Sequence, residues 1–160
     1  MNKTTVQNKE QRGFTLIELL VVIGILAILL AITLIAINPA RQFGQANDTK
    51  RRSAITQILN AVGAYTADNQ GQLPGALTAA TETEISKGGQ DLCSALVPKY
   101  IPALPQDPNS NGGADISTAC PAGYDTGYKI FKDGNNRVTV TAPLSYQQVT
   151  DGGAEITVTR

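Results

Sequence analysis

The strongest pattern in this chain is an apolar run close to its start. From Leu19 to Ile37 the sequence contains no charged residue and no proline. About 20 apolar residues in a helix that rises 1.5 Å per residue cross the ~30 Å hydrocarbon core of a bilayer. The pattern therefore predicts a membrane-spanning helix within segment 14–38.

The apolar run stops at Asn38 and Pro39, and a second helical pattern follows it. Proline removes a backbone donor and disfavours helix at the preceding residue, so we expect a kink or short break here. Beyond it, apolar side chains recur every 3.6 residues, which predicts an amphipathic helix over 39–71 that ends close to Asp68. The residues of this apolar stripe are Ala54, Ile55, Ile58, Leu59, Val62 and Tyr65.

Three consecutive basic residues, Lys50, Arg51 and Arg52, precede the apolar stripe. Such a run most often forms a solvated helix face, and this is the interpretation we prefer. The alternative is that the three side chains bind anionic lipid headgroups or the acidic residues of a neighbouring subunit.

The last segment, 128–160, changes to a period of two, which is typical of strands. The turn sequence DGNN at 133–136 separates two such runs and predicts a β-hairpin. A second hairpin is expected around DGG at 151–153, with strands over 145–150 and 154–159. Together the two hairpins predict an antiparallel sheet of three or four strands.

The alternation also assigns the two faces of this sheet. Val138 and Val140 would face the core, and Thr139 and Thr141 would face outward. The core face would cover the apolar stripe of the amphipathic helix, since antiparallel sheets commonly have one packed and one solvated face. With segment 72–127 as an irregular connecting region, the predicted fold class is α+β.

One carboxylate disturbs the start of the membrane-spanning pattern. Glu18 lies just ahead of the charge-free run, and the apolar segment contains no cation that would pair with it. An ionisable group inside a membrane is a functional hypothesis by default, and a buried charge without a partner is strongly unfavourable. Glu18 therefore points to a role beyond anchoring.

The sequence GFTLIEL, from Gly13 to Leu19, resembles the processing site of type IV prepilins and type II secretion pseudopilins. In that family a peptidase cuts after the glycine and methylates the new amino terminus, here Phe14. The fifth mature residue is then a glutamate, here Glu18. The resemblance implies that residues 1–13 are a cleaved leader and that a long N-terminal helix carries a packed head.

The resemblance also implies how subunits associate. Cleavage after Gly13 would leave an α-amine on Phe14, and this amine is the cation that Glu18 lacks. Pairing of Phe14 in one subunit with Glu18 in its neighbour would help to set the stagger of a helical homopolymer. The implied partners are further copies of the chain, the prepilin peptidase, an inner-membrane assembly platform and the membrane itself.

Charge alone does not orient the apolar helix, because basic residues flank both of its ends. Lys3, Lys9 and Arg12 lie on the leader side, and Arg41 and the three basic residues at 50–52 lie on the other. The resemblance implies a leader in the cytoplasm and a head outside the inner membrane. After assembly the subunit would be part of a cell-surface or extracellular filament.

Composition argues against several classes of function. The chain has no histidine, which removes the commonest general base and metal ligand, and it has no GxSxG, P-loop or HExxH motif. An enzyme is therefore not expected. The 160 residues include 13 basic and 13 acidic side chains, and loss of the leader would leave a slight negative excess. A nucleic-acid binder would be clearly basic, so none is indicated.

The two cysteines, Cys93 and Cys120, do not form a CxxC pair, and without histidine a zinc site is not expected. In an extracytoplasmic domain the natural interpretation is a disulfide. Closing a loop of this length would stabilise the fold by about 3.5 kcal/mol in the chain-entropy model. The alternative is a pair of buried free thiols.

One loop has the spacing of a calcium site. Asp107, Asn109 and Asn111 place oxygen-bearing side chains at alternate positions before Gly112, and Asp115 follows, as in the first half of an EF-hand loop. Position twelve, however, is a threonine rather than the expected glutamate. Calcium is thus a candidate ligand but no cofactor is required, and the alternative is a turn-rich loop.

The choice of machine stays open at this stage. The preferred function is a structural subunit of a type IV pilus-like filament, with a major pseudopilin of a type II secretion system as the alternative. LPQDP at 104–108 resembles the LPxDP turn of major pseudopilins and some pilins, and the calcium-like loop points the same way. The length after Ala142 and the disulfide favour a pilus subunit. A second alternative is a single-pass membrane protein that never polymerises and binds a ligand through its head.

Overall fold

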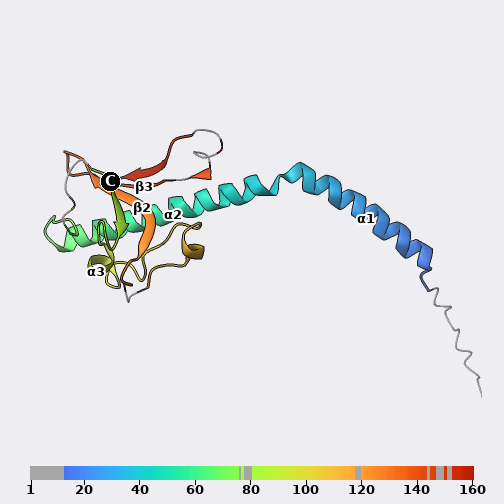
Figure 1. The fold of residues 1–160 in the computed structure, drawn as a ribbon, viewed down its shortest axis with the longest axis horizontal. Helices are drawn as coiled ribbons and strands as arrows, with labels where there is room; N and C mark the ends of the chain where they lie inside the picture. The colour runs from blue at the N-terminus through green and yellow to red at the C-terminus, as the bar shows by residue number, and fades with distance from the viewer. Residues whose placement is uncertain are drawn as a thin grey trace, which may run out of the picture. The chain divides into compact units, whose positions relative to one another are not determined.

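The computed structural model describes residues 13–75, 77, 81–117, 120–143, 145–146, 150 and 153–160. The chain divides into two compact units, Met1–Pro39 and Ala40–Arg160, and the second is called the head below. In its described residues the N-terminal unit consists mainly of one helix, and the head combines most of a second helix with an antiparallel sheet (Figure 1). The fold class is therefore α+β, as predicted.

Helix α1 (Leu16–Ile37) forms the N-terminal unit, and no side chain in its 22 residues is buried. In the part of the chain that the structure describes, it is the one helix long and apolar enough to cross a membrane. At 1.5 Å per residue it measures about 33 Å, which matches the hydrocarbon thickness of a bilayer.

The predicted break before Pro39 is present. Asn38 ends α1 in the left-handed region, with φ 45° and ψ 78°, and helix α2 (Pro39–Asp68) begins at the next residue. The proline ring disfavours helical geometry at the residue before it, and asparagine tolerates the left-handed region better than most residues. The local sequence thus accounts for the interruption.

Helix α2 carries the apolar stripe that the sequence predicted, and the stripe faces the core. It ends at Asp68, and Gly71 turns the chain away from the helix with a φ of +87°, which glycine adopts without strain. Apart from Asp48 and Arg51, the buried residues of α2 are Ala54, Ile55, Ile58, Leu59, Ala61 and Val62. Tyr65 packs against the same core and stays partly exposed.

Over the described residues the sheet has four strands in the order of the sequence, and every neighbouring pair is antiparallel. The strands are β1 (Thr83–Ser86), β2 (Asp125–Lys132), β3 (Val138–Ala142) and β4 (Ile156–Thr159). The predicted hairpin around DGNN is the β2–β3 pair. β1 lies in segment 72–127, where the sequence showed no strand pattern. The same segment contains helix α3 (Cys93–Leu96) and the short 3-10 turn η1 (Asn111–Gly113).

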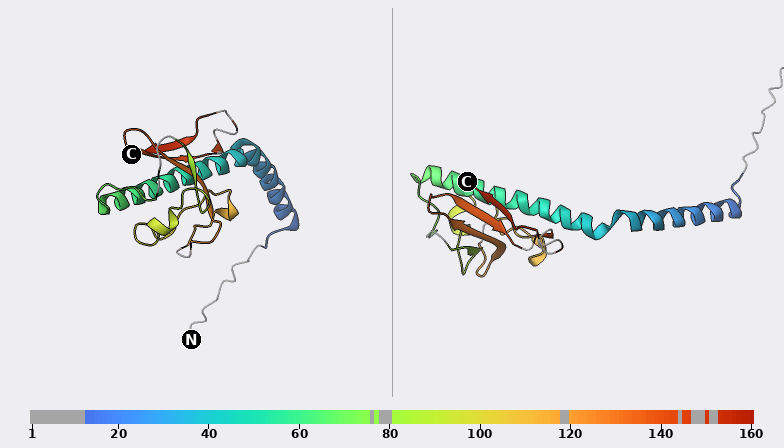
Figure 2. Two further views of the ribbon diagram at one scale, coloured as in Figure 1. Left: turned by 60° about the vertical axis from the view of Figure 1, so that its left-hand side comes forward. Right: turned by 90° about the horizontal axis from the view of Figure 1, so that it is seen from above.

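The core lies between α2 and the sheet, which are seen together in the views of Figure 2. Ile130, Val140 and Val158 lie opposite one another across β2, β3 and β4, and they line the core face of the sheet. The segment around α3 adds Leu92, Leu96 and Ile101 to the same cluster. A single hydrophobic core therefore joins the helix, the sheet and the connecting region.

The prediction that Thr139 and Thr141 face solvent is wrong. Both are buried, as is every residue of β3. β3 is a central strand, and its threonine face is covered: the Thr139 hydroxyl hydrogen-bonds that of Thr159 at 2.8 Å, and Thr141 donates to Glu82 at 3.1 Å. A strand that alternates valine and threonine can be buried on both faces when the threonine hydroxyls have hydrogen-bond partners.

The strand predicted over 145–150 is also wrong at the positions described. Tyr146 and Thr150 are helical, and the Thr150 hydroxyl donates to the Tyr146 carbonyl at 2.7 Å. The Tyr146 amide donates to Asp48 of α2 at 2.8 Å, and its ring covers Gly44, where a Cβ would clash. These contacts dock the segment on α2, so β4 pairs with β3 instead. The rest of this predicted strand, 147–149, lies outside the described residues.

Candidate processing and assembly site

The first turn of α1 contains the predicted processing and assembly residues. Thr15 caps the helix, and its hydroxyl accepts a hydrogen bond from the Glu18 amide at 3.3 Å. In return, the Thr15 amide and hydroxyl both donate to Glu18 Oε2, at 2.8 and 2.7 Å. This reciprocal arrangement is a capping box, which satisfies amides that a helix start leaves without partners.

The capping box leaves half of the Glu18 carboxylate open. Both bonds end on Oε2, so Oε1 accepts no hydrogen bond from the residues that the structure describes. Phe14 lies directly before the cap and is 83% exposed. The site therefore presents one acceptor oxygen and an accessible peptide bond between Gly13 and Phe14.

The three residues singled out from the sequence, Gly13, Phe14 and Glu18, thus lie together at one helix start. Sequence reasoning missed Thr15, although a signal was available. Thr15 and Glu18 have the T-x-x-E spacing of a capping box directly before an apolar run. The same glutamate therefore has a local structural role in addition to the assembly role implied by the resemblance.

A second polar cluster lies in the head, and it corrects the interpretation of the basic run. Arg51 is 1% exposed, and its guanidinium contacts Asp107 Oδ2 at 2.6 Å and Asp48 Oδ1 at 2.9 Å. Lys50 and Arg52 are exposed, so the solvated-face prediction holds for them and is wrong for Arg51. The hydrogen bonds that Arg51 donates to Asp107 are the main reason that the pKa of Arg51 is raised, so the guanidinium stays charged.

The Arg51 cluster also bears on the calcium hypothesis. Both carboxylate oxygens of Asp107 accept hydrogen bonds from Arg51. Oδ1 also accepts one from the backbone amide of Asn109, at 2.9 Å. Asn109 and Asp115 are exposed, and the Asn111 side chain lies outside the described residues. Among the residues described, no three acidic, cysteine or histidine side chains gather into a metal-binding group. Asp107 is therefore a poor calcium ligand in this arrangement, because a cation at its carboxylate would compete with Arg51.

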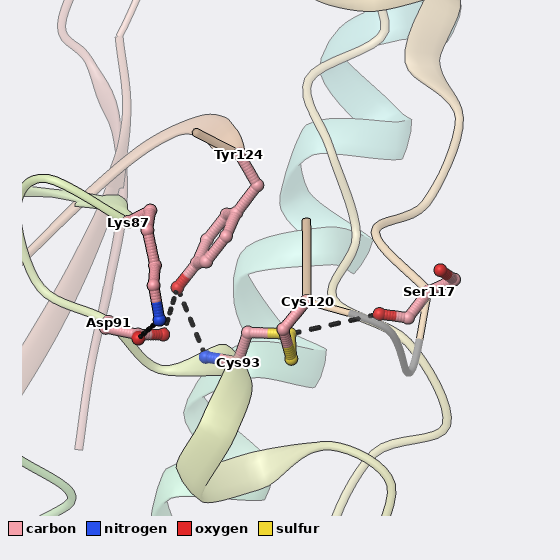
Figure 3. Close-up of a disulfide and its surroundings, with 6 residues drawn as sticks. All are labelled: Lys87, Asp91, Cys93, Ser117, Cys120 and Tyr124. Carbon is pink, nitrogen blue, oxygen red and sulfur yellow. Dashed lines mark hydrogen bonds and ion pairs between the residues drawn. A yellow bond between two sulfur atoms is a disulfide. The ribbon is translucent and has the colours of Figure 1, made fainter. Parts of the chain in front are cut away.

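Cys93 and Cys120 form the predicted disulfide, with a Cα–Cα distance of 5.7 Å (Figure 3). Beside it, the Tyr124 hydroxyl donates to Asp91 at 2.8 Å and accepts from the Cys93 amide at 3.2 Å. Lys87 donates to the other oxygen of Asp91 at 2.6 Å. Burial acts to raise the pKa of Asp91, but the hydrogen bonds from Lys87 and Tyr124 outweigh it and the net direction is downward.

The buried phenol next to the disulfide predicts an alkaline limit to stability. Burial raises the pKa of Tyr124 to about 12, and the bond to Asp91 adds to this effect. The folded state thus favours the neutral phenol more than the unfolded chain does, whose tyrosines titrate at about 10. The stabilisation is complete below pH ~10 and is lost between pH ~10 and ~12, by about 2 kcal/mol.

Tyr124→Phe tests this limit. At pH 7 the variant should lose about 1–2 kcal/mol, because Asp91 and the Cys93 amide each lose a partner. Above pH 10 its stability should fall less steeply than that of the wild type. Urea titrations of the detergent-solubilised chain, followed by near-ultraviolet circular dichroism, measure both slopes. Parallel slopes between pH 10 and 12 would contradict the assignment to Tyr124.

The comparisons with known proteins concern the N-terminal site. The family model of a prokaryotic N-terminal methylation motif matches residues 8–34, which include the Gly13–Phe14 bond, the capping box and most of α1. No curated protein and no solved structure matches the chain. The chain therefore carries the N-terminal signal of the type IV pilin and pseudopilin class, which makes it a membrane-associated substrate of prepilin peptidase.

Proposed function

We propose that this protein is a structural subunit of a type IV pilus-like filament, cleaved after Gly13, methylated on Phe14 and polymerised through α1. The observation that carries the proposal is α1 itself, which follows a prepilin-type signal and buries no side chain against its own chain. A helix that is apolar on all sides must be buried somewhere. Lipid surrounds it before assembly, and the α1 helices of other copies surround it in the filament.

The open oxygen of Glu18 supports a register contact between copies. After cleavage, the α-amine of Phe14 is a cation in a membrane segment that has no other, and Oε1 is the acceptor that the capping box leaves available. An amine from one copy on the carboxylate of the next is a head-to-tail contact. Repetition of one such contact builds an open helical filament.

A major pseudopilin of a type II secretion system is the second candidate function. The LPQDP sequence at 104–108 favours it, and its Asp107 is buried against Arg51, so this sequence anchors its loop to α2. Deletion of the gene separates the two: loss of surface filaments indicates a pilus, and loss of secreted proteins indicates a secretion pseudopilus. In both machines the head lies outside the inner membrane and an assembly platform builds the filament.

The mass of the protein purified from its native cells, without reduction, tests the processing steps. We expect the mass of residues 14–160 plus one methyl group and minus two hydrogens, the last from the disulfide. A Gly13→Val variant is the matched control, since an added side chain at Gly13 meets nothing within 4 Å and alters only the cleavage site. That variant should keep residues 1–13 and lack the methyl group.

A full-length mass with free thiols for the unaltered protein would contradict the proposal. The protein would then be a single-pass membrane protein that does not polymerise and acts through its head. A processed mass together with filaments that contain the protein supports assembly. A processed mass without filaments under any growth condition would contradict the structural role alone.

A further inference from the structure

Helix α2 exposes an apolar face near its start. Phe43 is 71% exposed, and it is the one large apolar side chain in the described part of the head that faces solvent to this extent. Ala40 and Ala46, one turn before and after it, are exposed as well. At 100° per residue Ala40 and Ala46 each lie about 60° from Phe43 around the helix, one on either side of it. They form a continuous strip.

The same face has a positively charged residue, Lys50, at its C-terminal end. Lys50 follows Phe43 by seven residues, which places it within about 20° of Phe43 around the helix and about 10 Å further along it. Its side chain is exposed and makes no ion pair with the described residues. Asn47, which lies between Phe43 and Lys50 along the helix, is polar and half-buried. The juxtamembrane face is defined here as Ala40, Phe43, Ala46 and Lys50.

At the start of α2 the head packs on another side of the helix. It covers the side of Phe43 only further along, where Ala54 and Ala61, within about 20° of Phe43 around the helix, are buried. Tyr146 covers Gly44, and Asp48 and Arg51 are buried. These three helix positions lie about 80–140° around the helix from Phe43. The apolar strip is therefore not part of the core of the head.

The chain length places Phe43 close to the membrane. Phe43 lies six positions after Ile37, the last residue of α1, which is a separation of about 9 Å as helix and at most about 20 Å if extended. The headgroup layer begins where the hydrocarbon ends and is about 5–7 Å thick on each side. An aromatic ring gains from burial at this boundary, and a lysine there extends its ammonium to lipid phosphates.

We propose that the juxtamembrane face binds an anionic lipid surface, with Phe43 inserted at the headgroup boundary and Lys50 on the phosphates. The proposal rests on the proposed function only in that α1 spans a membrane. Continuity with the spanning segment and the sign of Lys50 both favour lipid over a second copy of the chain. The contact holds the start of α2 at the membrane in the subunit before assembly.

The absence of tryptophan from the chain allows a direct test. Phe43→Trp introduces a single fluorescent reporter into the full chain, which is reconstituted at low protein-to-lipid ratio in vesicles of phosphatidylethanolamine and phosphatidylglycerol. We expect blue-shifted emission that brominated lipids quench. Gln57→Trp is the matched control, because Gln57 is also exposed on α2, about 40° around the helix from Phe43 and about 21 Å further along. Its reporter should resist quenching.

Lys50→Gln, combined with Phe43→Trp, tests the electrostatic part. A lysine near an anionic membrane contributes about 1 kcal/mol, so its loss should lower the ratio of inserted to withdrawn reporter about fivefold. In phosphatidylcholine vesicles the same change should have no effect. An equal effect in both lipids would overturn the role of Lys50.

Two outcomes would overturn lipid binding by Phe43. The first is emission that brominated lipids do not quench. The second is a blue shift that grows with the protein-to-lipid ratio without such quenching, which would mean that a second copy covers the face. The quenching measurement requires only that the chain is inserted in a membrane. Lipid binding by Phe43 can therefore be refuted while filaments still form. Conversely, filaments can be absent from cells while quenching persists, and only the proposed function then fails.

Discussion

Replacement of Glu18 by valine is expected to abolish filaments while the protein accumulates in the membrane at or above the wild-type level. Valine removes the only carboxylate in the first turn of α1, and with it the group that would pair with a neighbour's amine. It also removes a charge from the spanning segment, which favours retention in lipid. Opposite effects on anchoring and on assembly distinguish a filament subunit from a simple membrane anchor. Filament counts by electron microscopy and membrane levels by immunoblotting measure the two effects.

Glu18→Gln is the matched control, because it separates charge from capping. The glutamine oxygen still accepts from Thr15, so the capping box is retained while the charge is lost. We expect Glu18→Gln to lose filaments as Glu18→Val does. Wild-type filament numbers in Glu18→Gln, with loss in Glu18→Val, would assign the role to the cap and refute the pairing with Phe14.

Replacement of Arg51 by leucine is expected to destabilise the head by about 3–5 kcal/mol. Arg51 is 1% exposed and lies between Asp48 and Asp107, which are themselves buried. Without the guanidinium, the two carboxylates would lose the cation that contacts both of them in a site of low polarity. Such a loss is a large share of the 5–15 kcal/mol that stabilises a typical domain. The urea midpoint of the detergent-solubilised chain measures it.

Arg52→Leu provides the matched control, because Arg52 is the next residue and is exposed. Its replacement should change stability by no more than about 0.5 kcal/mol. In the double variant Arg51→Leu/Asp107→Leu, removal of one unpaired carboxylate should restore part of the stability. If the two substitutions were instead simply additive, Arg51 and Asp107 would not be coupled as the contact requires.

The N-terminal unit of this protein, Met1–Pro39, is predictable from sequence because its signals are local. The apolar run and its break depend on neighbouring residues only, and the structure has both, from Leu16 to Ile37 and at Asn38. The GFTLIEL sequence is likewise a contiguous signal. Even the capping residue Thr15, which the sequence analysis missed, follows from a spacing of three residues.

The head shows where sequence patterns stop being sufficient. Periodicity predicted the stripe of α2 and the β2–β3 hairpin, since each rests on regular spacing within one element. It did not predict β1, which has four residues and lies far along the chain from its partner β2. It also assigned 145–150 to the sheet, although contacts with Gly44 and Asp48 of α2 hold the described part of that segment.

By itself the sequence determined the long apolar helix, the processing signal and the apolar face of α2, and it made the only two cysteines a disulfide candidate. The tertiary structure decided which polar residues are buried. Arg51 looks like its neighbours Lys50 and Arg52, and only the return of Asp107 to α2, 56 positions later in the chain, makes it a buried ion-pair centre. Burial of a charge depends on partners brought together by folding, and a local pattern does not contain them.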